Sequence, residues 1–150
     1  MGPAVRGVSL PVERCPPGAQ TDTVTTTACP CRTGLPYEEC CGPLHSGRGR
    51  TPTAEHLMRS RFAAFALGDA AYLLRTWHPS TRPDVLELDT GVRWYRLDVL
   101  ATARGGLTDT EGTVEFRAYH RSPDAAGSQH EVSRFVRDDG AWVYLDGVTA

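Results

Sequence analysis

The chain has 150 residues, of which 40% are hydrophobic and 23% are charged, and its formal net charge at neutral pH is -2. This length fits one domain with a small attached segment, and the near-neutral charge excludes a basic surface for nucleic acid spread over the whole chain. The longest apolar run covers residues 62–67, far short of the ~20 residues of a membrane span. The N-terminal region also lacks the apolar core of a signal peptide, so we predict a cytoplasmic protein without a membrane anchor.

Residues 1–27 are predicted to form a disordered tail. They contain four prolines and the run TDTVTTT, but no sustained hydrophobic period. The next segment, residues 28–46, contains four of the five cysteines, and we call it the knuckle. A short flexible linker, residues 47–51, then leads to a second domain over residues 52–150.

The second domain begins with two predicted helices. Thr51 fits the N-cap of the first helix and Pro52 its first helical position. Apolar residues then recur at helical spacing: Met58, Phe62 and Phe65. Gly68 is predicted to end this helix, and a second helix is predicted over residues 70–77.

Four strands are predicted after the helices: residues 93–103, 113–121, 130–137 and 141–146. On the second strand, alternation places three residues on one face: Val114, Phe116 and Ala118. The run Asp138-Asp139-Gly140 is typical of a tight hairpin turn. Two helices followed by four strands in hairpin order predict an α+β fold, in which the helices cover one face of a curved antiparallel sheet.

The knuckle has the cysteine spacing of a metal site. A Cys-x-Cys pair is followed, after eight residues, by two adjacent cysteines: Cys29, Cys31, Cys40 and Cys41. Zinc takes four soft ligands at tetrahedral corners, so these thiolates predict a closed, structural zinc site with no position for water. A reducing cytoplasm disfavours disulfides, and the segment is too polar to bury its cysteines as a core.

Other interpretations of the cysteines stay open at this stage. Four thiolates also suit an iron–sulfur cluster, and cysteines can be buried or redox-active without any metal. His45 can replace one cysteine as a ligand, although Cys41 makes this unnecessary. Cys15 lies in the tail, and we interpret it as a spare thiol because structural zinc takes four ligands.

The knuckle resembles the SEC-C motif, a zinc motif at the carboxy terminus of the SecA translocation ATPase. That motif has Cys-x-Cys, eight residues and then Cys-Cys or Cys-His, and the four cysteines fit this spacing. It usually has Gly-Ser-Gly-Lys after the second cysteine, whereas this chain has Arg32-Thr33-Gly34-Leu35, so the lysine has no counterpart. In SecA the motif engages a chaperone and ribosomes, so the resemblance implies a docking role.

The chain from about Cys29 onward resembles the YchJ-like family of uncharacterised bacterial proteins. Three blocks carry the resemblance of the second domain: PTAEHLMRSRFAAFALGDAAYLLRTWHPSTRP, EFRAYHRS and HEVSRFVRDDGAWVYLDG. The family joins a SEC-C knuckle to a cone-shaped, cystatin-like α+β domain of the nuclear-transport-factor-2-like type. The resemblance therefore implies zinc and this fold, and it implies no particular activity.

The second domain contains polar residues but no catalytic motif, and we assign no catalytic residue. The candidate polar residues are Arg59, Arg61, His78, Glu115, His120, His130, Glu131 and Asp146. A glutamate beside an arginine or histidine can act as acid or base, but cross-strand ion pairs on a solvated sheet face are the favoured interpretation. The arginine run is interpreted as a solvated linker and helix face: Arg48, Arg50, Arg59 and Arg61.

Two classes of function follow from the sequence. The first is an adaptor whose knuckle docks a protein partner, with neither nucleic acid nor membrane expected as partner; RNA contact through the arginine run is a further alternative. The second is an enzyme or small-molecule binder that uses a pocket in the cone. A deep pocket with Glu115 or His130 pointing inward beside an arginine would favour this function. A cavity filled by aromatic side chains would argue against it: Phe62, Phe65, Trp94 and Phe116.

Overall fold

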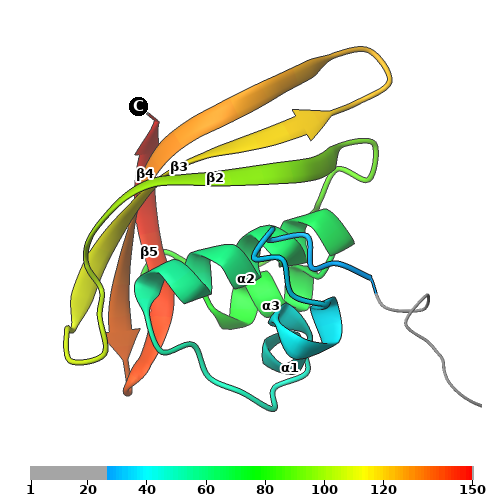
Figure 1. The fold of residues 1–150 in the computed structure, drawn as a ribbon. Coiled ribbons are helices and arrows are strands. Elements are labelled where there is room, and N and C mark those ends of the chain that lie inside the picture. Colours follow the sequence, from blue (N-terminus) through cyan, green and yellow to red (C-terminus); the bar gives the residue numbers. More distant parts are fainter. Residues whose placement is uncertain (1–26, 150) are drawn as a thin grey trace, which may run out of the picture.

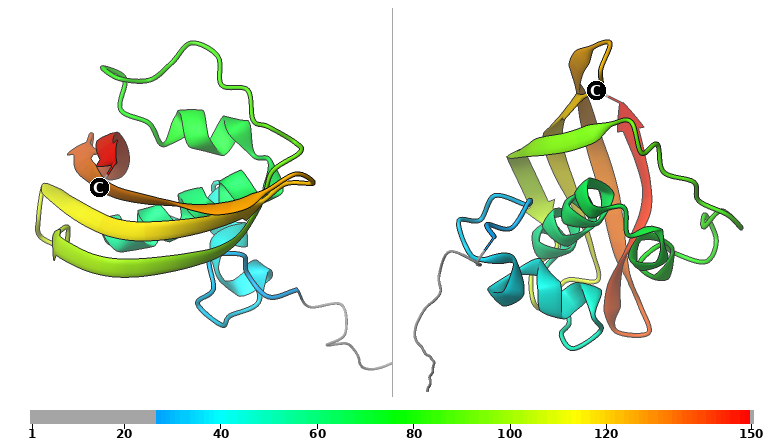
Figure 2. Two further views of the ribbon diagram at one scale, coloured as in Figure 1. Left: turned by 90° about the horizontal axis from the view of Figure 1, so that it is seen from above. Right: turned by 90° about the vertical axis from the view of Figure 1, so that its right-hand side faces the viewer.

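The computed structural model describes residues 27–149, so the predicted tail with Cys15 lies outside the described part, apart from Thr27. The described residues form short helices packed against a four-stranded antiparallel sheet (Figure 1). The sheet curves, and the two longest helices lie on its concave side (Figure 2). The predicted α+β fold is therefore confirmed.

Helix α2 (Ala54–Leu67) begins two residues later than the sequence indicated. Thr53 is the N-cap, and its hydroxyl accepts a hydrogen bond from the His56 N–H at 3.1 Å. The Ala54 N–H donates to the Gly105 carbonyl of the sheet, which fixes where the chain turns into the helix. The prediction that Thr51 and Pro52 start the helix is therefore wrong, because two similar threonines compete and a tertiary contact selects the second. Gly68 ends the helix as predicted, with φ of 76°.

Helix α3 (Ala70–Arg75) ends two residues before the predicted end. The Asp69 carboxylate caps its start by accepting from the Tyr72 N–H at 3.0 Å. Beyond the helix, the Tyr144 N–H donates to the Thr76 carbonyl and the His78 N–H donates to the Tyr144 carbonyl, both at 2.8 Å. The last strand of the sheet therefore pairs with the backbone that follows Arg75, and this pairing ends the helix.

The sheet contains β2 (Arg93–Arg104), β3 (Glu111–Arg121), β4 (Ala126–Asp138) and β5 (Ala141–Thr149) in that order. All neighbours are antiparallel, and register shifts interrupt the β2–β3 and β4–β5 pairs. All four predicted strands are present. However, β4 starts at Ala126 rather than at residue 130, because its first residues pair with the end of β3. The chain between the second and third predicted strands is thus partly strand.

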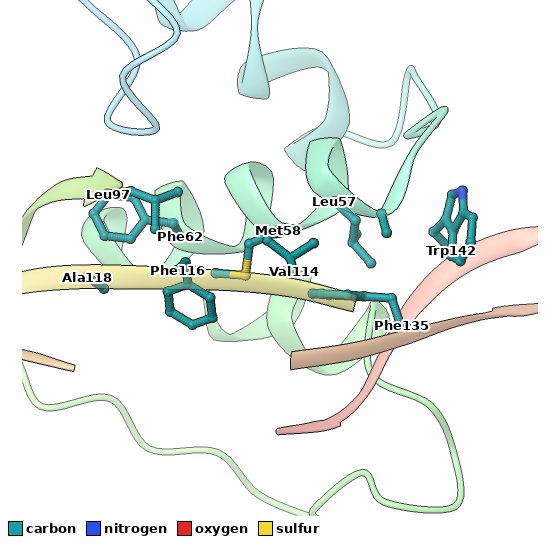
Figure 3. Packing of buried hydrophobic residues seen from close by; sticks show 10 residues of the cluster. Leu57, Met58, Phe62, Leu97, Val114, Phe116, Ala118, Phe135 and Trp142 are labelled. Carbon is teal, nitrogen blue, oxygen red and sulfur yellow. The ribbon is translucent and has the colours of Figure 1, made fainter. Parts of the chain in front are cut away.

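The main core lies between α2 and the concave face of the sheet (Figure 3). Helix α2 contributes Leu57, Met58 and Phe62, while Phe65 is half-buried. The predicted alternation on β3 is confirmed, with its three apolar side chains at most 5% exposed: Val114, Phe116 and Ala118. This packing fixes α2, and the knuckle packs against that helix.

Candidate metal centre

The knuckle folds so that its four cysteines meet. Cys29 and Cys31 lie in a turn closed by the Cys29 N–H, which donates to the Leu35 carbonyl at 2.9 Å. Arg32 and Gly34 take positive φ values of 68° and 92° in this turn. A 3-10 helix, η2 (Tyr37–Glu39), returns the chain to Cys40, and α1 (Cys41–His45) begins at the last cysteine.

The sulfur geometry fits a tetrahedral metal ion. The four Sγ atoms all lie within 4.8 Å of one another. The Cys31 and Cys40 Sγ atoms are 3.4 Å apart, and those of Cys40 and Cys41 are 3.8 Å apart. Four thiolates bonded to zinc at ~2.3 Å are separated by roughly 3.8 Å along each tetrahedral edge. The donor set therefore can hold a metal ion without rearrangement of the backbone.

The cluster is enclosed by protein. Cys31 and Cys41 are fully buried, and Cys40 is the most exposed of the four at 9%. The ring of Tyr37 packs against the cluster. Such burial leaves little room for a substrate beside the sulfurs, which agrees with a structural rather than a catalytic site.

The thiols influence one another strongly when no metal ion compensates their charge. Hydrogen bonding to the Cys29 and Cys41 thiols lowers the pKa of Cys31. Hydrogen bonding within the same cluster, together with burial, raises the pKa of Cys41, and hydrogen bonding to Cys31 raises the pKa of Cys29 to about 11. Without a metal ion, the cluster therefore favours a single deprotonated cysteine. A bound cation is needed to deprotonate all four cysteines.

Two residues that support the cluster were not identified from the sequence. The Thr33 hydroxyl lies 3.2 Å from the Cys40 Sγ and 3.7 Å from the Cys31 Sγ, so it can donate to a metal-bound thiolate. The Arg59 Nη1 donates to the Cys31 carbonyl at 3.0 Å. Thr33 occupies the position at which the SEC-C pattern has serine. The hydroxyl that the two residues share could have indicated this contact from the sequence. Arg59 comes from α2, and no local pattern indicates its contact.

His45 is not part of the cluster, because both nitrogens of its ring have other partners. Its Nε2 donates to the Ser60 carbonyl at 2.8 Å, and its Nδ1 accepts from the Tyr37 hydroxyl at 2.7 Å. The ring also lies 4.6 Å from that of Tyr72. The alternative in which His45 replaces a cysteine therefore has no support, and the residue instead joins the knuckle to α2.

The candidate polar residues of the cone do not form one site. Glu115 and His130 are hydrogen-bonded at 2.7 Å on the face of the sheet that points away from α2, while Arg134 pairs with Asp146 at an exposed position. His78 lies in the turn after α3, and His120 packs against Trp94. The favoured interpretation of cross-strand pairs is confirmed for Glu115, His130 and Asp146. Glu115 and His130 do not point inward.

Arg61 contradicts the interpretation of the arginine run as a solvated face, because its side chain is only 4% exposed. The sequence pattern failed here because Arg61 packs against α3 and β5, where it donates to the Leu73 carbonyl and lies over the ring of Tyr144. With Glu131 and the aromatic residues of α2, β2 and β3, it borders a cavity of about 220 Å³. The four aromatic side chains that would argue against a binding pocket if they filled it line the cavity instead: Phe62, Phe65, Trp94 and Phe116.

Comparison with known families agrees with this geometry. Residues 26–43 match the SEC-C motif, and residues 53–147 match the family described as "YchJ, middle NTF2-like domain". A UPF0225 protein of Streptomyces coelicolor is 58% identical over 122 residues, which cover 81% of this chain and 95% of that protein. This chain belongs to the YchJ-like UPF0225 family. A UPF0225 protein of Chromobacterium violaceum is 47% identical over 127 residues, covering 82% of this chain and 93% of that protein.

Solved structures of two similar proteins share the fold of this family member. A SEC-C motif containing protein from Rhodopseudomonas palustris, solved in solution, has a TM-score of 0.71 and 35% identity. The match covers 81% of this chain and 98% of that one. The crystal structure of a SEC-C motif containing protein from Psychrobacter arcticus has a TM-score of 0.67 and 33% identity, and the match covers 81% of this chain and 82% of that one.

Within residues 27–149, no helix is both long and apolar enough to cross a membrane.

Proposed function

We propose that this chain is a cytoplasmic zinc-binding adaptor whose knuckle docks a protein partner. The observation that carries the proposal is the cluster of four buried thiols beneath an exposed turn. The exposed part of the turn is residues 32–35, and Leu35 within it is 47% exposed. A metal-bound turn of this kind presents side chains in a fixed arrangement, which reduces the entropy lost when a partner binds.

Zinc is the metal that fits the donor set best. Four thiolates in a closed tetrahedral arrangement are typical of structural zinc, whereas an iron–sulfur cluster occupies more space than a single ion. Structural zinc in small fragments contributes an apparent ~10–16 kcal/mol to folding, and a segment as small as the knuckle has no other comparable source of stability.

The knuckle is also held firmly to the cone, as an adaptor requires. Besides His45 and Arg59, the Arg75 Nη2 donates to the carbonyls of Leu44 and His45 at 3.3 and 3.1 Å. These contacts lie on the side that faces α2 and α3, so the exposed turn of residues 32–35 is left for a partner.

Affinity capture with wild type and a Cys29→Ser, Cys31→Ser double variant tests the docking role. We expect the captured proteins to be lost with the metal. Leu35→Glu should keep the metal but also lose the partner, because it places a charge in the exposed turn. Leu107→Glu is the matched control, since Leu107 is 72% exposed in the β2–β3 loop. Capture of the same proteins by wild type and the double variant would contradict the docking role.

RNA contact through the arginine run has less support than protein docking. Arg61 is buried, and Arg59 is engaged by Glu55 at 3.1 Å and by the Cys31 carbonyl. The run therefore does not form one continuous basic surface, which is the feature that nucleic-acid binding requires.

A second candidate function, small-molecule binding by the cone, is favoured by the cavity beside Arg61.

A further inference from the structure

The cavity on the concave face of the sheet is large enough for a small aromatic molecule. Its volume is about 220 Å³, and an apolar cavity of roughly 150 Å³ already holds benzene. Its apolar wall comes from α2 and the sheet: Met58, Phe62, Phe65, Trp94 and Phe116. Aromatic rings on several sides favour a flat, apolar ligand body.

Arg61 gives one end of this cavity a buried positive charge. Its Nη1 donates to the Leu73 carbonyl at 2.8 Å and to the Thr76 hydroxyl at 2.7 Å, which fixes the guanidinium in place. The guanidinium also lies over the rings of Trp77 and Tyr144, at 5.2 and 4.7 Å from their centroids. Burial lowers the pKa of Arg61 to about 10, so the side chain stays charged at neutral pH.

The residues around Arg61 leave its other donors free. Across residues 27–149, no carboxylate forms an ion pair with Arg61, and its Nε and Nη2 make no hydrogen bond. Only the Trp77 Nε1 is fully buried without a hydrogen bond among the side-chain nitrogens and oxygens of residues 27–149. The Nε and Nη2 of Arg61 therefore keep some accessible surface. Arg61 is one of the residues that line the cavity, which places this side chain at the edge of the space a ligand would fill.

Glu131 borders the same cavity, and both of its carboxylate oxygens accept hydrogen bonds from other side chains. Its Oε1 accepts from the Gln129 Nε2 at 2.7 Å, and its Oε2 accepts from the Ser133 hydroxyl at 2.7 Å and from the Tyr144 hydroxyl at 3.5 Å. The indole Nε1 of Trp77, also at the cavity, is buried without a partner. The Trp77 indole and the Arg61 nitrogens are thus donors without a protein partner at the cavity, and a ligand that carries acceptors can satisfy them.

We propose that this cavity binds a small aromatic carboxylic acid, with its ring among the aromatic side chains and its carboxylate on the free N–H groups of Arg61. A carboxylate matches the fork of a guanidinium, and burial of the pair strengthens the interaction. This site is independent of the docking role proposed for the knuckle, because none of its residues belongs to the knuckle.

Titration of the metal-loaded full chain with benzoate and with benzamide, followed by NMR, tests the proposal. The two molecules have nearly the same shape, but only benzoate is an anion. We expect benzoate to bind at least about tenfold more tightly, since a charge-assisted hydrogen bond exceeds a neutral one by about that factor. Shifts should occur at the indole of Trp77 and not at that of Trp142, whose Nε1 donates to the Pro52 carbonyl away from the cavity.

A matched pair of charge variants makes the test independent of folding defects. Arg61→Gln would also remove two structural hydrogen bonds, so it is a poor probe. Glu131→Gln keeps the length and shape of the side chain and removes a negative charge at the cavity, but its amide group replaces one of the two acceptor oxygens. Once its NMR spectrum shows that the fold is retained, it should bind benzoate several-fold more tightly, with little effect on benzamide. Glu115→Gln makes the same charge change on the opposite face and should alter neither. Equal affinity for benzoate and benzamide, no detectable binding of either, or equal effects of the two variants would overturn the proposal.

Discussion

At the scale of single residues, His45 joins the knuckle to the cone through both nitrogens of its ring. Because its Nε2 donates to a carbonyl, the neutral ring carries its proton on Nε2, and Nδ1 is free to accept from Tyr37. The ring thus bridges a residue of the knuckle and a residue of α2. It supports the position of the knuckle without contributing to the metal donor set.

Replacement of His45 by alanine should loosen the knuckle while keeping the metal. We expect His45→Ala to lower the free energy of unfolding by about 2 kcal/mol, because two hydrogen bonds and an aromatic contact are lost. Metal content should stay stoichiometric, as measured by emission spectroscopy. His56→Ala is a suitable control, since the His56 side chain makes no hydrogen bond within residues 27–149. Loss of the metal in His45→Ala would show that the residue is a ligand after all.

The environment of Tyr144 changes the pKa of its phenolic hydroxyl. Burial, with a further contribution from the Glu131 carboxylate, raises the pKa of Tyr144 from its ordinary value of 10.0 to about 12. The folded state therefore keeps the phenolic proton at a pH where the unfolded state loses it. The resulting stabilisation is fully present below pH 10 and is lost as the pH rises toward 12.

Tyr144→Phe should consequently flatten the alkaline loss of stability. Urea unfolding at a series of pH values above 10 should show a shallower decline for the variant than for wild type. Tyr95→Phe is the control, because Tyr95 is 42% exposed on the sheet. Parallel pH profiles for Tyr144→Phe and wild type would show that the phenol does not titrate differently on folding.

At the scale of elements, periodicity located the helices and strands, while tertiary contacts set several of their ends. The apolar spacing of α2 and the alternation on β3 are local properties, and both were predictable. The start of α2 depends on a contact with Gly105, and the end of α3 depends on pairing with Tyr144. Both contacts join residues that are far apart in the sequence, so a local pattern cannot indicate them.

The hairpin between β4 and β5 is an element whose turn was predicted correctly. Asp138 pairs with Ala141, and the two residues between them take φ values of 54° and 83°: Asp139 and Gly140. A two-residue turn with both φ values positive matches the right-handed twist of the strands. Nothing lies within 4 Å of a Cβ added at Gly140, so the backbone alone determines the cost of a substitution.

Gly140→Ala should therefore lower the free energy of unfolding by about 1 kcal/mol, the cost of a left-handed alanine. Chemical denaturation would measure this change in the free energy of unfolding. Gly106→Ala, in the β2–β3 loop, is the comparison, because Gly106 is not among the residues with positive φ and an added Cβ would make only ordinary contact. Its effect should stay within about 0.5 kcal/mol. Equal effects of the two substitutions would contradict the strain argument.

At the scale of the whole molecule, the sequence indicated the donor set of the knuckle but not its surroundings. Cysteine spacing within one short segment determines which sulfurs can meet, and it was sufficient. The contact of Arg59 with Cys31 and the burial of Arg61 depend on how α2 packs between the knuckle and the sheet. The cavity was likewise unpredictable, since it is formed by residues of α2 and of all four strands.

We propose that the four cysteines of the knuckle hold one structural zinc ion, which orders this segment. The most direct measurement is the zinc content of the purified chain, compared among wild type, Cys40→Ser and Cys15→Ser, with amide hydrogen exchange on each. We expect one zinc ion per chain in wild type and Cys15→Ser. Cys40→Ser should lose the ion and the protection of residues 28–45, while the sheet stays protected. Stoichiometric zinc in Cys40→Ser, or none in wild type, would contradict the claim.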